Sequence, residues 1–164
     1  MNDITTVAAQ TRVLKPGDVA VATRGERLET LLGSCVAVVL TDPRRTVGAM
    51  CHIVHASEPP RDADGDTAFA RCAMERLFAD LRRLGIAPEL CEARVYGGGN
   101  MFPQFFSERH VGAVNTRWVL AFLGDVGMDV RAQSIGGACY RKLGWTVGPD
   151  EPECTLVDVV DGPH

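Results

Sequence analysis

The sequence predicts an α+β fold in which several short strands are combined with two main helices. Short β-prone runs separated by turn residues recur along the chain, and the most apolar of them covers residues 36–40. Two longer stretches, 67–84 and 111–124, repeat apolar residues at the spacing of an amphipathic helix. Several strands with only two helices are typical of this class. At 164 residues the chain is expected to form a single domain over 11–164, after a flexible N-terminal tail over 1–10.

Composition sets limits on the function. The net charge of −4 and the pI of about 5.5 argue against a protein that binds nucleic acid. No segment approaches the roughly 20 apolar residues that a membrane span needs. The N-terminus lacks the charged and then apolar pattern of a signal peptide. We therefore expect a cytoplasmic protein that neither binds nucleic acid nor inserts into a membrane.

Six cysteines occur in the chain. The absence of a secretory signal argues against disulfides, and no CxxC or CxxH pair indicates a metal site. Four of the cysteines are expected to be small buried residues of the core, namely Cys72, Cys91, Cys139 and Cys154.

In the first third of the chain, β-prone runs alternate with turn residues. The expected strands are 11–14 and 19–23, the expected turns are 15–18 and 24–26, and residues 29–32 lead into Gly33-Ser34-Cys35. The run 36–40 is apolar on both faces, which predicts a strand buried on both sides.

A hairpin is expected to follow the cysteine. Residues 41–45 form the turn, and 46–54 return as the second strand. With the turn centred near Arg44, residue i pairs with about residue 88 − i, so Cys35 faces about position 53 and His52 lies near the thiol. A slip of one residue would turn a side chain to the other face of the sheet.

The second half of the chain contains both helices. The first has its apolar residues at Phe69, Cys72, Ala73, Leu77, Leu81 and Leu84, and Gly85 ends it. The second has an apolar stripe formed by Val114, Trp118, Val119 and Phe122. Strands are expected over 91–96 and 128–134, with one or two more over 143–160.

Cys35 is the candidate nucleophile. A cysteine at a tight turn after glycine can present its thiol outward, with nearby backbone N–H groups free to hold an oxyanion. A histidine beside it, His52, would act as the base and is expected to bring the pKa of the thiol below the roughly 8.5 of a free cysteine. The alternative is that both residues belong to the core. His55, three residues on, should point to the opposite face and is the weaker candidate.

Two glycine runs, 97–99 and 136–137, follow expected strands. Neither has the residues of a phosphate-binding loop or a dinucleotide fingerprint. They are consistent with tight turns at positive φ. They are equally consistent with a place where another backbone approaches closely, and both interpretations stay open.

The order and spacing of these motifs resemble a known family. The motifs are Pro16-Gly17-Asp18, Leu32-Gly33-Ser34-Cys35-Val36-Ala37-Val38, Asp42-Pro43, Val47-Gly48-Ala49-Met50-Cys51-His52, Gly97-Gly98-Gly99-Asn100-Met101-Phe102, Val111-Gly112-Ala113-Val114-Asn115, and Gly136-Gly137 with Arg141. From about residue 11 to 146 the chain is similar to the CheD chemoreceptor glutamine deamidases.

The resemblance implies a layered α/β/β sandwich of mixed β-sheets, shared with bacterial toxin deamidases. It implies hydrolysis of particular glutamines on methyl-accepting chemotaxis receptors to glutamate and ammonia, through a cysteine thioester and without a metal or organic cofactor. By the same resemblance a CheC-type phosphatase is a further binding partner.

The resemblance also assigns roles to residues. Cys35 would be the nucleophile, His52 the general base, and Thr30 the hydroxyl residue that orients the histidine. The substrate and the oxyanion would lie near Gly33, Ser34, Gly98 and Gly99.

Two other classes compete with this interpretation. A copy of the family can act as an adaptor without catalysis, in which case Cys35 would react no faster with iodoacetamide than the other cysteines. A redox sensor would need a resolving cysteine, and Cys51 is the candidate. Because adjacent strand residues point to opposite faces, Cys51 should not face Cys35 if His52 does.

Overall fold

The computed structural model describes residues 10–159. The expected tail, residues 1–10, lies outside this range apart from Gln10, as do residues 160–164 at the end of the expected domain. The strands of the described part are β1 (Thr11–Leu14), β2 (Val19–Thr23), β3 (Arg27–Leu32), β4 (Val36–Thr41), β5 (Val47–Ile53), β6 (Glu92–Gly97), β7 (Asp129–Ile135), β8 (Cys139–Thr146) and β9 (Glu153–Asp158). Its helices are α1 (Ala70–Arg83) and α2 (Val111–Asp125), with short 3-10 turns at η2 (Arg61–Ala63) and η3 (Pro88–Leu90).

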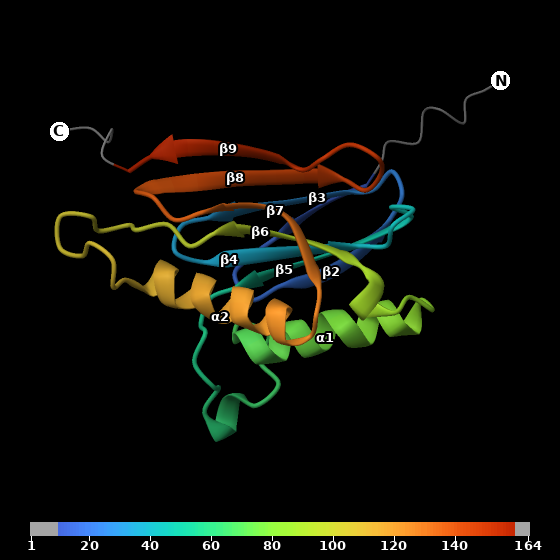
Figure 1. Cartoon of the computed structure of the whole chain (residues 1–164), viewed down its shortest axis with the longest axis horizontal. Helices are drawn as coiled ribbons and strands as arrows, with labels where there is room; N and C mark the ends of the chain where they lie inside the picture. Colours follow the sequence, from blue (N-terminus) through green and yellow to red (C-terminus); the bar gives the residue numbers. More distant parts are fainter. Residues whose placement is uncertain (1–9, 160–164) are drawn as a thin grey trace.

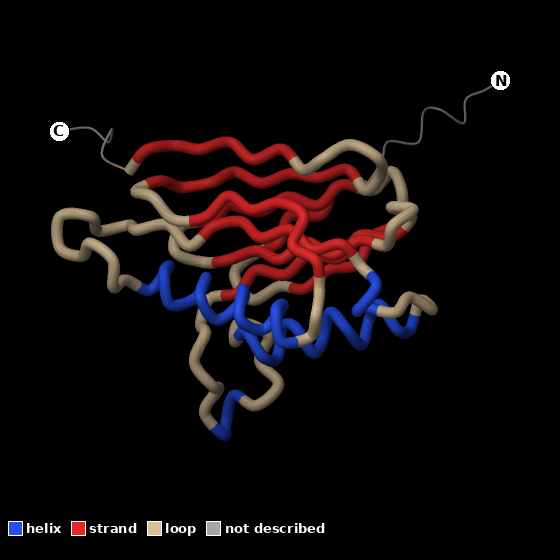
Figure 2. Tube along the Cα trace, in the orientation of Figure 1, coloured by secondary structure: helices blue, strands red, loops and turns tan. Residues whose placement is uncertain are grey.

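The strands form two mixed sheets that lie face to face. One has four strands in the order β1-β3-β8-β9, and the other has five in the order β2-β5-β4-β6-β7. Both helices cover the free face of the five-stranded sheet, so Figure 1 shows helices, sheet and sheet as successive layers. Figure 2 shows all of the helical segments on one side of the strands. The predicted α+β class and the layered α/β/β arrangement are confirmed.

The five-stranded sheet is buried on both faces because helices cover one side and the second sheet covers the other. Every residue of β4 and β5 is buried. Val36, Val38 and Leu40 face the helices, whereas Ala37 and Val39 face the other sheet. The continuous apolar run at 36–40 was expected to be buried on both sides, and it is.

Helix α1 uses the predicted apolar spacing to pack on the sheet. Ala73, Leu77 and Leu81 are fully buried one turn apart. Leu84 follows the helix as its C-cap and is exposed, so its assignment to the apolar stripe was wrong. Gly85 then takes a φ of +78°, the left-handed conformation that ends many helices.

Helix α2 packs on the core with most of the predicted apolar stripe, and one residue of the stripe is an exception. Its buried side chains include Asn115, Val119 and Leu123, which lie one turn apart, whereas Val114 is half exposed. Trp118, Val119 and Phe122 pack against the core as predicted, so only Val114 was wrongly assigned to the stripe. A polar residue at position 115 conceals this face from a search for apolar side chains.

Two further strands also differ from the prediction. Residues 139–142 belong to the long strand β8, although a strand was expected only from residue 143 onward. Residues 27–32 are a strand as well, since β3 pairs with β8 along its whole length. Both strands lie in the four-stranded sheet, where only one face is buried and the apolar signal is weaker.

The hairpin of β4 and β5 has a register one residue away from the expected one. Val36 pairs with Ile53 and Ala37 with His52, so that residue i faces residue 89 − i. The expected register would have placed His52 opposite Val36, on the helix side. The observed one places it opposite Ala37, on the side of the four-stranded sheet.

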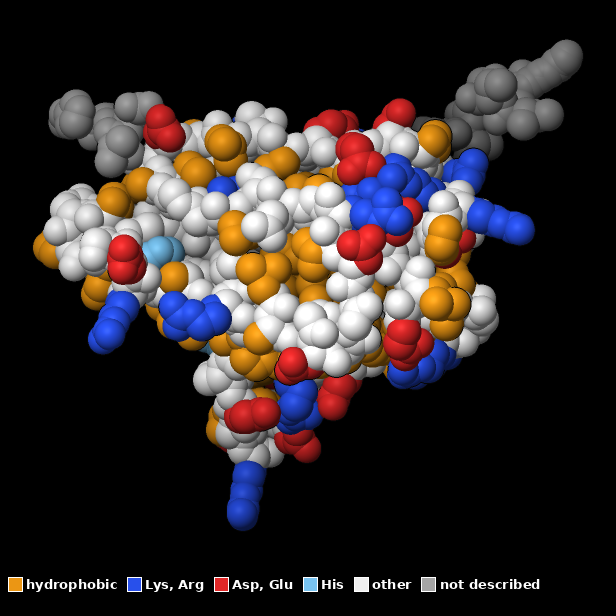
Figure 3. All heavy atoms as spheres, in the orientation of Figure 1, with side chains coloured by type: hydrophobic (Ala, Val, Ile, Leu, Met, Phe, Trp, Pro, Cys, Tyr) orange, Lys and Arg blue, Asp and Glu red, His pale blue; other side chains and the backbone are white. Residues whose placement is uncertain are grey.

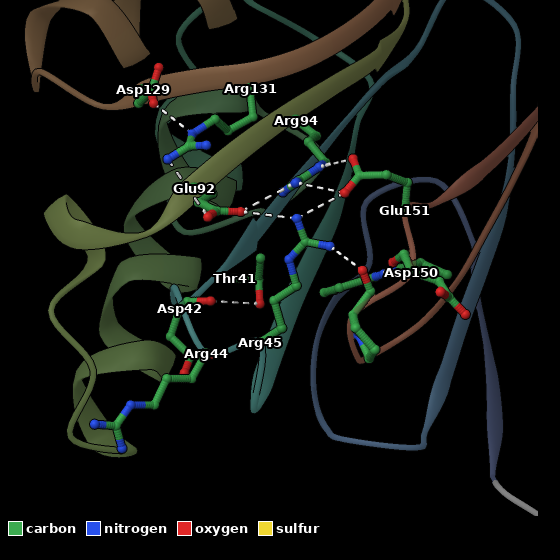
Figure 4. Close-up of polar contacts among 12 residues, drawn as sticks. Thr41, Asp42, Arg44, Arg45, Glu92, Arg94, Asp129, Arg131, Asp150 and Glu151 are labelled. Carbon is green, nitrogen blue, oxygen red and sulfur yellow. Dashed lines mark hydrogen bonds and ion pairs between the residues drawn. The ribbon is translucent and has the colours of Figure 1, made fainter.

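An ion-pair network closes the end of the sandwich near the hairpin turn (Figure 4). Arg94 is almost fully buried and pairs with Glu151 at 2.8 Å and Glu92 at 3.2 Å. Arg45 from the hairpin turn pairs with the same two carboxylates, at 2.9 Å and 3.4 Å respectively. The network joins three segments that are distant in sequence: the hairpin turn, β6, and the loop before β9.

Neither helix of residues 10–159 combines the length and the apolarity that crossing a membrane would require.

Candidate active site

The loop that carries Cys35 crosses from one sheet to the other. β3 ends at Leu32 in the four-stranded sheet, and β4 begins at Val36 in the five-stranded sheet. Only Gly33, Ser34 and Cys35 connect them. Cys35 is partly exposed at this crossing, and its side chain packs against the core between the sheets. The loop thus delivers a thiol to the mouth of the space between the two sheets.

Every carbonyl of this loop is held by a donor from elsewhere in the chain. The Gly33 carbonyl accepts from the N–H of Gly99 at 2.9 Å, and the Cys35 carbonyl accepts from the N–H of Gly98 at 2.9 Å. The Ser34 carbonyl accepts from Nδ2 of Asn115 at 3.2 Å. With all three carbonyls fixed, the loop has one defined conformation.

The backbone N–H groups of the loop differ from its carbonyls, which are all bonded. Among residues 10–159, no acceptor is present for the N–H groups of Ser34 and Cys35. Two adjacent free N–H groups beside a thiol are the donors that an oxyanion requires. By contrast, the N–H groups of Gly98 and Gly99 are occupied by the carbonyls of Cys35 and Gly33. These glycines lie in the expected vicinity, but their amides hold the loop.

His52 lies on β5, with 2% of its surface exposed. It is opposite Ala37, and Cys35 is two residues from Ala37 along the chain. Residues two apart on an extended chain lie on the same face, so His52 and Cys35 both face the four-stranded sheet. Cys51 pairs with Val38 and faces the helices, away from Cys35. It therefore cannot act as a resolving cysteine in this fold.

Thr30 lies on β3, across the space between the sheets from His52. Its Oγ1 is 2.7 Å from Nδ1 of His52 and 2.8 Å from the carbonyl oxygen of Leu14. A carbonyl can only accept, so the single hydroxyl proton of Thr30 goes to Leu14. The hydroxyl oxygen must then accept from an N–H at Nδ1. This fixes the imidazole tautomer and leaves Nε2 of His52 with a free lone pair.

The turn at residues 15–18 holds the backbone of the same histidine. The N–H of Gly17 donates to the His52 carbonyl at 2.8 Å, and the His52 N–H donates to the Asp18 carbonyl at 3.0 Å. Gly17 has a φ of +90°, a conformation that is unfavourable for any residue with a side chain. The proline-glycine turn was predicted as a turn, but its contact with His52 is not visible in the sequence.

Burial sets the protonation states of both groups. It lowers the pKa of His52, against a smaller opposing effect of the Asp18 charge, and so favours the neutral imidazole. It raises the pKa of the Cys35 thiol, which is the direction opposite to the expected activation. Both shifts favour a neutral thiol beside a neutral imidazole over a thiolate beside an imidazolium.

The first glycine run combines the two interpretations that the sequence left open. Gly97 has a φ of +114°, and a Cβ there would lie 2.2 Å from the Cys35 carbonyl oxygen. Gly98 has a φ of +67°, and a Cβ there would lie 2.0 Å from Oγ1 of Thr116. These residues are turns at positive φ, and they are also the place where another backbone, the Cys35 loop, approaches closely.

Asn115 is the main residue of the site that the sequence did not single out for a role. It is buried on α2, and its Nδ2 donates to the carbonyls of Ser34 and Val54. Its Oδ1 accepts from the N–H of Ala56 at 3.0 Å. One side chain thus joins α2, the Cys35 loop and the end of β5. An asparagine one turn before Val119 and two turns before Leu123 on a helix is the signal that could have revealed it.

A pocket of about 460 Å³ lies beside the loop. It is lined by Ser34, Asn115, the residues after β5 and the loop before α2, but not by Cys35 or His52. His55 lines it too and packs against Phe69, with ring centroids 4.8 Å apart. β5 ends at Ile53, so His55 lies beyond the strand whose alternation was used to predict its face.

Within the part of the chain that the structure describes, the remaining cysteines and acidic residues form no second centre. All six cysteines are free thiols; Cys72, Cys91 and Cys139 are buried as expected, whereas Cys154 is only partly buried. Within residues 10–159, no group of three or more histidine, cysteine or carboxylate side chains could hold a metal ion.

Comparison with known proteins places this architecture in a family. The model of the family described as "CheD chemotactic sensory transduction" matches residues 55–149. This match does not include Cys35 or His52. Curated relatives extend over more of the chain, as follows.

A probable chemoreceptor glutamine deamidase CheD from Pseudomonas savastanoi pv. phaseolicola is 36% identical over 134 residues, covering 80% of this chain and 76% of the relative. A second, the probable chemoreceptor glutamine deamidase CheD 2 of Albidiferax ferrireducens, is 34% identical over 136 residues, with 79% and 78% covered. A third, from Caulobacter vibrioides, is 32% identical over 138 residues, with 84% and 72% covered. The chain belongs to the CheD family.

Proposed function

We propose that the protein is a glutamine deamidase that converts side-chain amides of chemoreceptors to carboxylates, with Cys35 as the nucleophile. Membership of the CheD family and the names of the relatives support the reaction and the substrate. The observation that carries the mechanism is the hydrogen bond between Thr30 and Nδ1 of His52, because it leaves Nε2 free on the face that Cys35 shares.

The first step is attack of Cys35 on the amide carbon of glutamine. Nε2 of His52 takes the thiol proton as the bond between sulfur and carbon forms. Because both pKa shifts favour the neutral groups, we expect proton transfer to accompany the attack. The amide oxygen becomes an oxyanion, which the N–H groups of Ser34 and Cys35 stabilise.

The second step releases ammonia. The His52 imidazolium returns its proton to the amide nitrogen, the bond between carbon and nitrogen breaks, and a thioester on Cys35 remains. Water then attacks the thioester while His52 takes its proton. The thiolate leaves and is protonated by His52, and the receptor side chain is now glutamate. Thr30 holds the imidazole in one orientation through each transfer.

We also propose that the protein works in the cytoplasm and has a CheC-type phosphatase as a further partner. A nucleophilic thiol needs a reducing compartment to stay active, which supports this location. Co-purification of the two proteins, compared with a mixture in which the phosphatase is omitted, tests the second partner.

The reaction is tested with a purified receptor cytoplasmic fragment. Mass spectrometry counts the shifts of about +1 Da that accompany conversion of an amide to an acid. We expect Cys35→Ala and His52→Ala to abolish these shifts, whereas Cys154→Ala, which removes another partly exposed thiol, leaves them unchanged. Undiminished deamidation by Cys35→Ala would overturn the proposed mechanism.

A further inference from the structure

The pocket beside the Cys35 loop is not accounted for by the chemistry above. It lies between the loop at 99–110, the start of α2 and the residues after β5. Cys35 and His52 do not line it, so it is separate from the reacting groups. Ser34 does line it, so the pocket begins one residue from the nucleophile.

The rim of this pocket is an exposed apolar surface. Phe102, Phe106, Val111 and Val114 line it, and each is about half exposed or more. Figure 3 shows hydrophobic side chains along the protruding loop between β6 and α2. Large apolar side chains gathered around a hollow are typical of a surface that binds another protein.

One charge accompanies the apolar surface. Arg109 is the only lysine, arginine, aspartate or glutamate that lines the pocket, and within the described chain it forms no ion pair. A partner that fills the pocket with apolar side chains can therefore also place a carboxylate against this guanidinium.

The pocket is rigidly connected to the Cys35 loop. Asn115 lines the pocket and at the same time binds the carbonyls of Ser34 and Val54. A group bound in the pocket is thus held at a fixed position relative to Cys35. This is what an enzyme needs if its substrate is one side chain of a large protein, because the residues beside that side chain must contact the surface around the nucleophile.

We propose that this pocket binds the receptor segment that flanks the reactive glutamine, taking its apolar side chains against Phe102, Phe106 and Val114 and its carboxylate against Arg109. This inference rests on the proposed function and adds to it the class of residue that the enzyme requires next to the glutamine. A glutamine in a purely polar segment is a poor substrate, even when it is equally accessible.

The test separates binding from chemistry. In a Cys35→Ala background, the affinity for the labelled receptor cytoplasmic fragment is measured by fluorescence anisotropy. We expect Phe102→Ser and Val114→Ser each to weaken it about tenfold, since each removes most of an apolar contact. Arg109→Glu should weaken it at low ionic strength and much less at high ionic strength.

The control is Phe105→Ser. Phe105 lies on the same loop and is more exposed than Phe102, at 77% against 60%, but does not line the pocket. We expect it to leave the affinity unchanged. With Cys35 present, Phe102→Ser should raise KM for deamidation about tenfold with kcat unaltered, and it should leave iodoacetamide alkylation of Cys35 as it is.

The outcomes distinguish this inference from the proposed function. Loss of affinity in the pocket variants but not in Phe105→Ser supports the pocket, even if no deamidation is detected. Equal affinity of Phe102→Ser, Val114→Ser and the parent protein, with deamidation intact, overturns it and leaves the reaction standing. Concentration-dependent self-association, or binding of a CheC-type phosphatase, that is lost in Phe102→Ser while receptor binding is retained also overturns it.

Discussion

At the scale of single residues, the site depends on one proton. The Thr30 hydroxyl has one hydrogen, which the Leu14 carbonyl takes, so the oxygen can only accept from His52. A side chain that is small and uncharged thereby decides which nitrogen of the imidazole is basic. The charge of Asp18, the nearest opposing influence, is too weak to reverse the effect of burial on the pKa of His52.

We expect Thr30→Val to lower kcat for deamidation about 10²-fold or more, because Nδ1 loses its acceptor and the base its orientation. Thr30→Ser keeps the hydroxyl and should retain most of the activity. The Leu14 carbonyl would lose the Thr30 donor and the ring N–H at Nδ1 of His52 would lose its acceptor in the valine variant, so urea denaturation should show a loss of about 1–3 kcal/mol. Equal kcat in the valine and serine variants would contradict this role.

The pH profile follows from the two shifted pKa values. His52 acts as a neutral base, and burial holds its pKa below the usual value of about 6.5. We therefore expect kcat/KM to persist below pH 6.5 and to fall only as the pH drops through the lowered pKa. The stability that comes from burying a neutral His52 changes in the same sense: it is present above about pH 6.5 and lost as the pH falls through the folded-state pKa.

The rate of alkylation of Cys35 should depend on pH in a different way from kcat/KM. Because burial raises the pKa of the thiol, the rate of reaction with iodoacetamide should still be rising at about pH 9. Cys51, whose pKa burial raises to about 12, provides the unreactive comparison within the same protein. A plateau below about pH 8 would instead indicate a resting thiolate paired with an imidazolium.

At this scale the sequence was sufficient for the candidates but not for their partners. Cys35, His52 and Thr30 follow from a motif, and the structure brings them together from the two facing sheets, with Thr30 on one sheet and His52 on the other. Their catalytic roles remain predictions. Asn115 and the contact of the 15–18 turn with His52 depend on segments that meet only after folding, so no local pattern contains them.

At the scale of elements, the Cys35 loop is positioned by the glycine turn after β6. Gly97 packs its Cα against the Cys35 carbonyl, and the N–H groups that follow hold the loop from the same side. The two segments are distant in sequence, yet each fixes the conformation of the other. A side chain at position 97 would have no room. The positive φ of Gly97 is also unfavourable for any residue with a side chain.

We expect Gly97→Ala to displace the Cys35 loop and to destabilise the protein by more than the roughly 1 kcal/mol that positive φ alone costs. Gly127→Ala is the matched control, since Gly127 also has positive φ but nothing within 4 Å of an added Cβ. Urea denaturation of both variants, with alkylation of Cys35, measures the difference. Equal losses of stability in the two variants would show that the close approach of the Cys35 carbonyl does not exclude a side chain at position 97.

The hairpin shows that the sequence predicts the strands of an element but not the register in which they pair. Composition predicts two strands and a turn, and both strands are present. The register depends on which turn residues pair, which a count from the turn centre cannot resolve to a single residue. That single residue decides whether His52 faces the helices or Cys35.

At the scale of the whole molecule, the chemistry and the ion-pair network occupy opposite ends of the sandwich. β4 begins beside Cys35 and ends at the hairpin turn, six residues or roughly 20 Å away. The layered fold could be predicted from the resemblance and the periodicities. The network could not, because its members come from three separate segments.

We expect Glu151→Gln to destabilise the protein by about 1–2 kcal/mol, since the buried Arg94 then retains only Glu92 as an anionic partner. Glu89→Gln, which breaks the exposed pair with Arg82, should cost less. Thermal denaturation compares the two variants at one ionic strength. Because the network is far from Cys35, kcat and KM should be unchanged in both, and a change in either would contradict this separation.

β1 contributes no side chain to the proposed reaction, and it lies at an edge of the four-stranded sheet. Its last carbonyl nevertheless receives the Thr30 proton. Edge strands open more easily than central ones, and such opening has its own free energy. Each time β1 detaches, the hydroxyl can turn its hydrogen toward His52, and the imidazole proton can then move to the other nitrogen. The pairing of an N-terminal edge strand with β3 thus helps to keep the base in its competent tautomer.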